Sequence, residues 1–290
     1  MTPREAGFLL LCSKLGDPER CPLTTAQLRE LTRRVRKMER PKEDRKLSVE
    51  DLLILDYDYA SAERIVKLLS DFSMMEDYVQ RGKQCGCSPV TLIGRDYPAV
   101  LQKRLSEDAP GVLWAKGDLR LLKKPAISLV GSRDLKIDNC RFAWEIGRRC
   151  AREGFVLVSG NARGADHEAQ SACLSRGGSV ISIVADELAD KLPDPGVLYL
   201  SENNFDCPFS AERAHSRNRL IHSMGCRTFV AQTECGKGGT WSGTVKNLRN
   251  GWSPVYCFRD GSEGMKQLMQ MGAKCVDFAS LEEDGHLFSL

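Results

Sequence analysis

Glycine, serine and arginine follow a short apolar run of the chain at the point where that run ends. Residues 126–130 read Ala-Ile-Ser-Leu-Val, and Gly131, Ser132 and Arg133 come directly after them. Glycine lets a ligand approach the backbone closely, serine offers a hydroxyl, and the arginine guanidinium matches pairs of phosphate oxygens. The segment is therefore suited to a phosphate-bearing ligand, although Arg133 could instead pin the turn to a carboxylate such as Glu202.

A second segment of small residues has the same character. Ser159, Gly160, Arg163, Gly164 and Asp166 lie between an apolar run and a helical stretch. A tight turn that opens a helix presents free backbone N–H groups, which favour anions. We expect Asp166 to be the N-cap of that helix, where it either only caps the helix or also contacts the ligand.

Two arginines flank an amide further along the chain, at Arg217, Asn218 and Arg219. Helical residues two positions apart diverge by about 200°, so both arginines cannot face one ligand. We expect one of them to contact the ligand and the other to hold neighbouring structure.

A glycine-rich segment precedes another helical stretch and contains Lys237, Gly238, Gly239, Thr240 and Trp241. Its backbone N–H groups could cradle a phosphate. It lacks the G-x-x-x-x-G-K-[ST] order of a nucleoside-triphosphatase loop. Trp241 either stacks on a base as an exposed indole or packs against the sheet.

All of these segments follow or adjoin predicted strands of one α/β domain. A strand at 126–130, a helix that Asp138 caps and that ends at Gly154, and a strand at 155–158 form a βαβ unit, which implies parallel strands. Further strands are expected at 180–184, 197–200, 228–231, 255–258 and 275–278, and further helices at 167–175 and 211–224. The sequence thus predicts a Rossmann-like, doubly wound, mostly parallel sheet, whose strands share one carboxyl edge where the ligand binds.

The first part of the chain has a different, helical pattern. Thr24 with Gln27 and Ser48 with Asp51 have the spacing of capping boxes, and 62–72 has apolar residues at helical spacing. We expect a small helical domain over residues 1–82, a linker over 83–96 and the Rossmann-like domain over 97–290. The helices could contact either nucleic acid or another protein.

The composition agrees with a cytoplasmic protein that has a sizeable core. Hydrophobic residues make up 42% of the chain and no apolar run is long enough to span a membrane. The twelve cysteines are scattered, which favours free thiols, and Cys85 and Cys87 have no second pair at zinc-ligand spacing. Nine Lys/Arg against four Asp/Glu over 29–46 form either a solvated helix face or an auxiliary patch for a nucleic-acid backbone.

The motifs together resemble those of the DNA-processing protein A (DprA/Smf) family. The resemblance begins at Tyr97-Pro98, includes the stretch 113–118, and continues through the segments at 130–133, 159–166, 201–202 and 217–221 in the family's order. It covers about residues 97–258. The sequence departs from the family pattern at Gln170, where the family has histidine, and in the glycine-rich segment.

The resemblance implies single-stranded DNA binding without strong sequence preference, in DNA recombination and natural transformation. It also implies a homodimer that assists a RecA-type recombinase, with Arg133 and the Arg217 region lining the DNA groove. No catalytic residue, cofactor or metal is expected.

The alternative is a nucleotide sensor or hydrolase of the related phosphoribohydrolase-like superfamily, with a possible role in phage defence. Enzymes of that group carry a glutamate three residues after a Gly-Thr pair. Here Gly243 and Thr244 are followed by Asn247 at that spacing, so the acid/base group for hydrolysis is missing.

Overall fold

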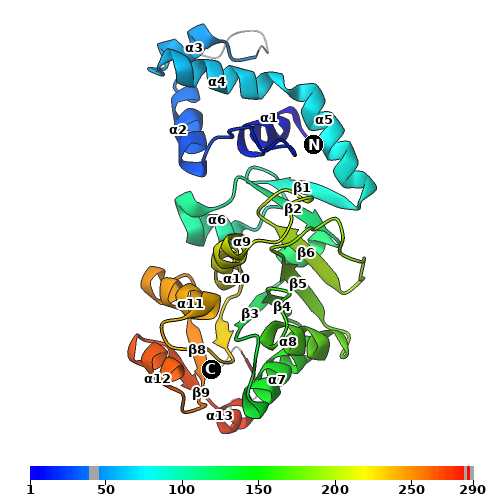
Figure 1. Ribbon diagram of the computed structural model, residues 1–290, viewed down its shortest axis with the longest axis vertical. Coiled ribbons are helices and arrows are strands. Elements are labelled where there is room, and N and C mark those ends of the chain that lie inside the picture. Colours follow the sequence, from blue (N-terminus) through cyan, green and yellow to red (C-terminus); the bar gives the residue numbers. More distant parts are fainter. Residues whose placement is uncertain (39–45, 284–285, 288–290) are drawn as a thin grey trace.

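The structure is a computed structural model, and it describes residues 1–38, 46–283 and 286–287. Helices at the N-terminal end of the chain lie above a larger part built from strands and helices (Figure 1). None of the helices in these ranges is both long and apolar enough to cross a membrane.

The described residues form one nine-stranded sheet. In chain order its strands are β1 Cys87–Thr91, β2 Val112–Lys116, β3 Ala126–Val130, β4 Val156–Ser159, β5 Ser179–Ile183, β6 Val197–Ser201, β7 Thr228–Val230, β8 Val255–Phe258 and β9 Lys274–Val276. Their order across the sheet is β1-β2-β6-β5-β4-β3-β7-β8-β9. The seven strands from β6 to β9 are parallel, whereas β1 and β2 add an antiparallel hairpin. The prediction of a Rossmann-like, mostly parallel sheet is confirmed.

The strand order reverses between β3 and β7. From β3 the chain steps outward through β4, β5 and β6, then returns to the other side of β3 to form β7, β8 and β9. In open α/β sheets, ligands bind in the crevice beyond the carboxyl ends of the strands at such a reversal. The residues that follow β3 and β7 are therefore the ones expected to contact a ligand.

Helices cover the parallel strands. They are α6 Ala99–Leu105, α7 Ile137–Glu153, α8 Ala165–Leu174, α9 Ala211–Ser216, α10 Asn218–Met224, α11 Gly238–Asn250, α12 Glu263–Gln270 and α13 Phe278–Glu283, with short 3-10 turns η1 Ser106–Asp108 and η2 Leu119–Lys123. The helices α7 and α8 pack closely because α7 has a glycine, Gly147, against the backbone of Ala169. The core beneath them is formed by the strands' own apolar side chains, such as Ile127, Leu157 and Phe229, which are fully buried.

Several predicted element boundaries differ from the structure. The expected helix 211–224 is broken into α9 and α10 at Arg217. The last strand is shorter than expected, because Phe278 begins α13. The N-cap of α7 is Lys136, so the prediction that Asp138 caps this helix is wrong, whereas Gly154 ends it in the left-handed conformation as expected.

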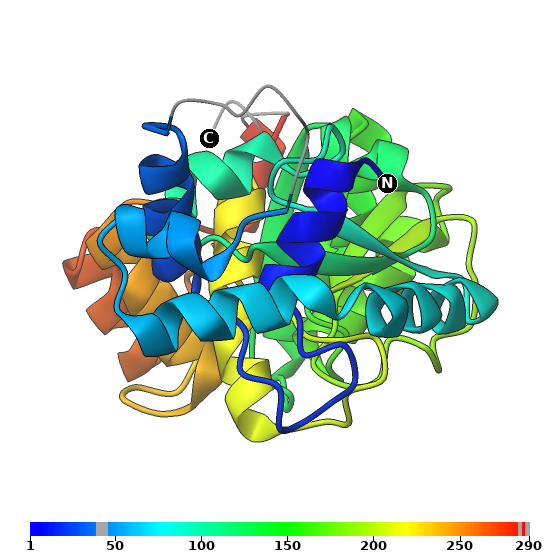
Figure 2. The same cartoon turned by 90° about the horizontal axis from the view of Figure 1, so that it is seen from above.

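The N-terminal part contains α1 Pro3–Cys12, α2 Thr25–Val35, α3 Val49–Ile54, α4 Tyr59–Ser70 and α5 Phe72–Gln84. Both capping boxes form, at Thr24 with Gln27 and at Ser48 with Asp51. Seen from above, α4 and α5 follow one another across this end of the molecule (Figure 2). Two helices were not expected: α1, which has its own capping box at Thr2 and Glu5, and α5.

The segment 83–96, expected to be a linker, contains the end of α5 and the strand β1. This strand pairs with β2, from Cys87 opposite Lys116 to Thr91 opposite Val112. Where the helical domain ends and the Rossmann-like domain begins stays a prediction.

The twelve cysteines are all free thiols, as predicted. Cys150, Cys173 and Cys257 are buried, and burial raises the pKa of each thiol. These side chains act as small apolar residues of the core.

Part of the basic run 29–46 lies outside the described residues, because 39–45 are not described. The described arginines are largely engaged by the protein itself. Arg33 and Arg34 pair with Glu30 at 2.6 Å, and Arg29 donates to the carbonyl of Ser106. These contacts partly neutralise the charge of this helix face, and an auxiliary patch for a nucleic-acid backbone stays a prediction.

Candidate nucleotide-binding site

A pocket of about 910 Å³ opens at the carboxyl ends of β3 and β7, where the strand order reverses. Residues after each of these strands line it, from Gly131 to Asp134 on one side and from Gln232 to Cys235 on the other. The site predicted from the strand ends and the pocket in the structure therefore share the same edge of the sheet.

Ten of the predicted site residues line this pocket: Gly131, Ser132, Arg133, Asp166, Arg217, Asn218, Lys237, Gly238, Gly239 and Thr240. The other six do not line it: Ser159, Gly160, Arg163, Gly164, Arg219 and Trp241. Each of these six residues instead has a contact or a backbone conformation within the protein, described below.

The segment between β4 and α8 is held by internal hydrogen bonds. The Ser159 hydroxyl is buried and accepts from Gln170 Nε2 at 2.6 Å. Gly164 is the N-cap of α8, with a positive φ of 80°, so the prediction that Asp166 is the N-cap is wrong. Asp166 lies in the first turn of α8 and accepts from the backbone N–H of Ala162 at 3.1 Å. Because a positive φ is strained for other residues, glycine is required at position 164.

The buried side chain of Arg217 lines the pocket and joins two strand ends. Its guanidinium donates to the carbonyl oxygens of Gly160 and Ile183, at the ends of two neighbouring strands. A side chain on Gly160 would collide with this guanidinium, which explains the glycine. Burial raises the pKa of Asp166, and the positive charge of Arg217 opposes that effect. Burial likewise lowers the pKa of Arg217, and Asp166 opposes it.

Arg219 points to a different partner. It donates to Glu202, which follows β6, at 2.5 Å. The expectation that only one of the two arginines reaches the ligand region agrees with the pocket, since Arg217 lines it and Arg219 does not. Both, however, are tied to neighbouring structure.

The glycine-rich segment forms the first turns of α11 rather than a separate loop. A Cβ on Gly239 would lie 2.8 Å from Asn218 Nδ2, and one on Gly243 would lie 3.2 Å from His222 Nε2. Gly239 and Gly243 therefore let α11 pack closely on α10. This packing, together with a 2.9 Å hydrogen bond from Asn218 to the carbonyl of Gly239, fixes the start of α11 at the pocket.

Trp241 lies within this first turn and is partly buried. Its side chain packs against the main hydrophobic core. Of the two interpretations of the sequence, packing against the sheet is the one that the structure favours. The neighbouring Thr240 donates to the carbonyl of Gly131 at 2.9 Å, which joins the turn after β3 to α11.

Five helices that begin beside the pocket have no side-chain hydrogen bond at their N-caps: α7, α8, α10, α11 and α12. Of the other helices, α1 to α4 and α9 are capped by Thr, Ser or Asp side chains, whereas α5 and α6 are not. Uncapped N–H groups need an acceptor and carry partial positive charge. Their convergence on one pocket is suited to an anionic ligand.

The cations at the pocket differ in how they are engaged. Lys237 pairs with Glu234 at 2.9 Å, and Arg163 pairs with Asp134 at 2.9 Å. Arg133 is exposed and has no hydrogen bond or ion pair to any residue that the structure describes. The side chain of Lys136 is likewise exposed and unpaired within the described ranges. These two cations are available to a ligand.

Sequence reasoning missed several pocket residues. His215 of α9 and Gln232 after β7 line the pocket, as do Asp260 and the residues 262–264 after β8. The strand-end rule that found Gly131 would also have found Asp260, since it follows β8 by two residues. His215 has no such signal, because α9 is placed by tertiary packing.

A sequence model of the family described as DNA recombination-mediator protein A matches residues 89–283. The chain belongs to this family. The resemblance to DprA/Smf proteins expected from the motifs is thereby confirmed, and it extends beyond the residues 97–258 on which the expectation rested.

Curated relatives of this member of the DNA recombination-mediator protein A family include three bacterial proteins. It is 27% identical to DNA processing protein DprA of Bacillus subtilis over 67% of this chain and 69% of that protein. It is 29% identical to DprA of Streptococcus pneumoniae over 58% of this chain and 64% of that protein. Protein Smf of Escherichia coli is 28% identical over 58% of this chain, and the match spans 49% of that protein.

Solved structures of the same family share the fold. The X-ray structure of S. pneumoniae DprA has a TM-score of 0.74 and 23% identity, and the match covers 98% of this chain and 99% of that one. DNA processing protein A from Helicobacter pylori has a TM-score of 0.55 and 24% identity, over 65% of this chain and 90% of that one. At this identity the likeness establishes the fold, including the N-terminal helices in the first case.

Proposed function

We propose that this protein binds single-stranded DNA at the pocket between β3 and β7 as an accessory protein of DNA recombination. The observation that carries this proposal is the convergence of the uncapped starts of α7, α8 and α11 with the unpaired cations Arg133 and Lys136 at one edge of the sheet. Phosphates along a strand are the ligand that such a surface would bind through charge and backbone N–H groups.

Two features of the relatives support this ligand. The chain belongs to the DNA recombination-mediator protein A family, and the H. pylori relative is described by its single-stranded DNA binding mode. We further propose that the protein acts as a homodimer in the cytoplasm, assists a RecA-type recombinase and serves natural transformation.

The proposed site consists of residues predicted from the sequence, in two roles. Gly131, Ser132, Arg133 and the start of α11 would contact phosphate directly. Ser159, Gly160, Gly164, Arg217 and Arg219 would hold the phosphate-binding groups in place.

We propose that the protein does not catalyse hydrolysis of the ligand. The position that carries the glutamate in phosphoribohydrolases is Asn247, which is fully buried. Asn247 Nδ2 lies 3.1 Å from both His222 Nδ1 and Ser253 Oγ, in a network behind the pocket. Because the side-chain amide of Asn247 is bonded within this network, we assign it a structural role.

The test is fluorescence polarisation with labelled single-stranded and duplex DNA of the same sequence, with free nucleotides as competitors. We expect preferential binding of the single strand, and weak competition by mononucleotides. The double variant Arg133→Ala/Lys136→Ala should lose most of the affinity. The matched control is Arg176→Ala, since Arg176 is an exposed arginine beyond the other end of α8.

Two outcomes would contradict the proposal. Equal affinity of the double variant and the control for single-stranded DNA would show that the pocket does not bind DNA. Saturation of the pocket by a mononucleotide at micromolar concentration, with no binding of the polymer, would favour the nucleotide-sensor alternative.

A further inference from the structure

The charged side chains are not spread evenly around the pocket. Arg133 and Arg217 lie with the residues after β3 and at the start of α10, whereas Lys136 also lines a smaller cavity with Asp260 and so lies beside the carboxylates described next. The opposite end, which we call the α12 end, is formed by residues 233–235, Asp260 and residues 262–264. It carries the carboxylates of Glu234, Asp260 and Glu263, and only Glu234 is paired with a cation among the described residues. These carboxylates make the α12 end less suited to a phosphate than the Arg133 end.

Two hydroxyls at the α12 end have no hydrogen-bond partner among the described residues. Thr233 is only 4% exposed, yet its Oγ1 is unpartnered. The Oγ of Ser262, the N-cap of α12, is also buried and unpartnered. Because a buried polar group without a partner costs free energy, each such group needs an explanation, and an absent ligand is one.

The two hydroxyls belong to segments that touch. Gly264, in the first turn of α12, lies so close to the segment after β7 that a Cβ would meet the backbone nitrogen of Cys235 at 3.0 Å and collide with the carbonyl of Thr233. The glycine thus brings the start of α12 onto Thr233. Both hydroxyls are held at the same end of one pocket.

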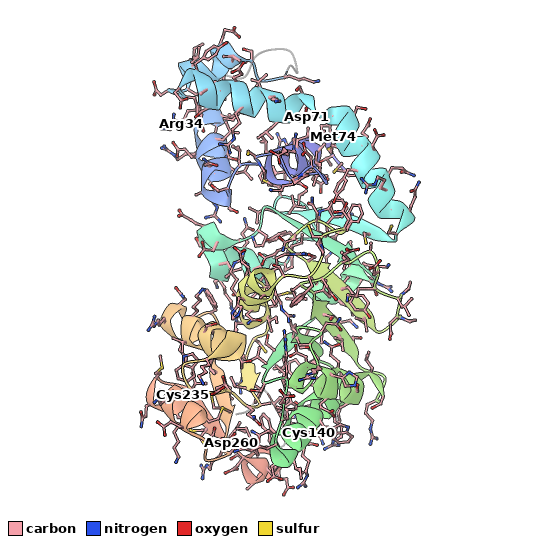
Figure 3. The ribbon with its side chains drawn as sticks, in the orientation of Figure 1. Arg34, Asp71, Met74, Cys140, Cys235 and Asp260 are labelled. Atoms are coloured by element: carbon pink, nitrogen blue, oxygen red, sulfur yellow. The ribbon has the colours of Figure 1, made fainter. Side chains whose placement is uncertain are left out.

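The carboxylate of Asp260 is fixed in orientation. It accepts from Asn139 Nδ2 and from the backbone N–H of Ser262, each at 2.8 Å. Asp260 therefore lies between α7 and the start of α12, in the lower part of the molecule where Figure 3 labels it. Glu263 is exposed, and its Oε1 accepts from Gln267 at 3.0 Å. A carboxylate has more than one lone pair, so it can accept further hydrogen bonds.

We propose that the α12 end binds the hydrogen-bond-donating edge of a nucleobase whose phosphate is held at the Arg133 end. This inference rests on the proposed function. Carboxylates accept hydrogen bonds from amino groups of bases, and hydroxyls can complete the pairing. The two ends together then give a site for a whole nucleotide unit of the strand, with a preference for bases that carry an exocyclic amine.

The experiment compares oligonucleotides that differ at one central base within oligo-dT. Adenine and unsubstituted purine form the critical pair, because they differ only by the exocyclic amine. Polarisation titrations should show about 10-fold or more tighter binding of the adenine oligonucleotide, the effect of one hydrogen bond to a charged acceptor. A ribose in place of deoxyribose at the central position tests the sugar hydroxyl as the alternative donor.

Two variants assign the preference to this end of the pocket. Glu263→Gln and Thr233→Val should each reduce the adenine-over-purine ratio toward one, while affinity for plain oligo-dT changes less than twofold. The control is Glu76→Gln, since Glu76 is an exposed carboxylate on α5, remote from the pocket. Circular dichroism melts of each variant separate loss of the preference from loss of folding.

The outcomes are distinguishable from those for the proposed function. Equal binding of the adenine and purine oligonucleotides, or equal effects of the variants on all oligonucleotides, overturns the base site but leaves DNA binding intact. A preference for ribose without any dependence on the base assigns the α12 end to the sugar and also overturns it. Absence of binding to every oligonucleotide overturns the proposed function itself.

Discussion

Arg219 donates to Glu202 across 2.5 Å, so the carboxylate that the sequence offered to Arg133 is bonded to another arginine. The sequence left two roles for Arg133: binding of a phosphate, or an internal ion pair with a carboxylate such as Glu202. In the described residues Glu202 is largely buried and pairs with Arg219, not with Arg133. Arg133 instead faces the pocket without an ion-pair partner in the described part of the chain.

The first prediction follows from this arrangement. Arg133→Ala should weaken single-stranded DNA binding by a similar factor for different sequences, because binding to a phosphate carries no base information. The slope of log K against log salt should become shallower by about 0.7 for each phosphate that the variant no longer binds. Arg133→Lys should rescue part of the affinity, because lysine restores the positive charge but cannot make the two parallel hydrogen bonds of a guanidinium.

The control for this prediction is thermal melting. Arg133→Ala should melt close to the unchanged protein, since the side chain is exposed and makes no internal bond to the described residues. A clearly lower melting temperature with an unchanged salt slope would assign Arg133 a structural role.

A second prediction concerns Trp241. Because its side chain packs against the core, Trp241→Phe should retain DNA affinity within about twofold, and Trp241→Ala should lower stability. Stacking on a base would give a different result, since removal of a stacking aromatic costs about 1–3 kcal/mol of binding free energy. Affinity and urea unfolding measured on both variants separate the two roles; weakened binding by a fully stable Trp241→Ala protein would favour stacking.

The third prediction compares two glycines in helices. In α7, a Cβ on Gly147 would lie 2.8 Å from the carbonyl carbon of Ala169, so Gly147→Ala should destabilise the protein by about 1–3 kcal/mol. In α1, nothing lies within 4 Å of a Cβ on Gly7. Gly7→Ala should be neutral or stabilising by up to about 1 kcal/mol, because alanine favours the helix. Urea unfolding of both variants is the measurement, and equal destabilisation would contradict the packing of α7 on α8.

The fourth prediction is a pH dependence from His222. Burial lowers its pKa from 6.5 to about 3. Below pH 6.5 the unfolded chain therefore binds a proton at His222 that the folded protein does not bind, so stability falls as the pH decreases toward the folded pKa. The loss approaches about 1.4 kcal/mol per pH unit below pH 6.5, which gives roughly 2 kcal/mol between pH 7 and pH 5.

Unfolding by urea at pH 7, 6 and 5 measures this slope. His222→Gln should flatten it whatever the change in absolute stability, and His167→Gln should leave it unchanged because His167 is exposed. An imidazole resonance of His222 that titrates near pH 6.5 in the folded protein would refute the prediction.

Much of the fold is determined by local features of the sequence. Apolar runs such as 126–130 and 255–258 became β3 and β8 with the expected bounds. The capping boxes at Thr24 and Ser48 formed because a side chain and a backbone N–H three residues apart need no distant partner. The edge of the sheet that holds the pocket was also predictable, since parallel strands place all their carboxyl ends together.

Other features depended on contacts between distant residues. The strand β1 has no alternating apolar pattern and contains Pro89, so only its pairing with β2 makes it a strand. The sequence offered Gly239 only as part of a phosphate cradle, whereas in the structure both Gly239 and Gly243 let α11 pack on α10. Residue type gives no indication of which of these uses applies.

The partners of three arginines also could not be predicted from the sequence. Arg133, Arg217 and Arg219 have the same chemistry in the sequence, yet one is exposed at the pocket, one is bonded to two buried carbonyls and one is paired with Glu202. Gly160 lies 57 residues from Arg217 along the chain. Local sequence determines which groups are available for bonding. The partner of each group is set by the tertiary packing that brings distant strand ends together. Hydrogen bonds and ion pairs act only over a few ångströms, so only groups that the fold places side by side can pair.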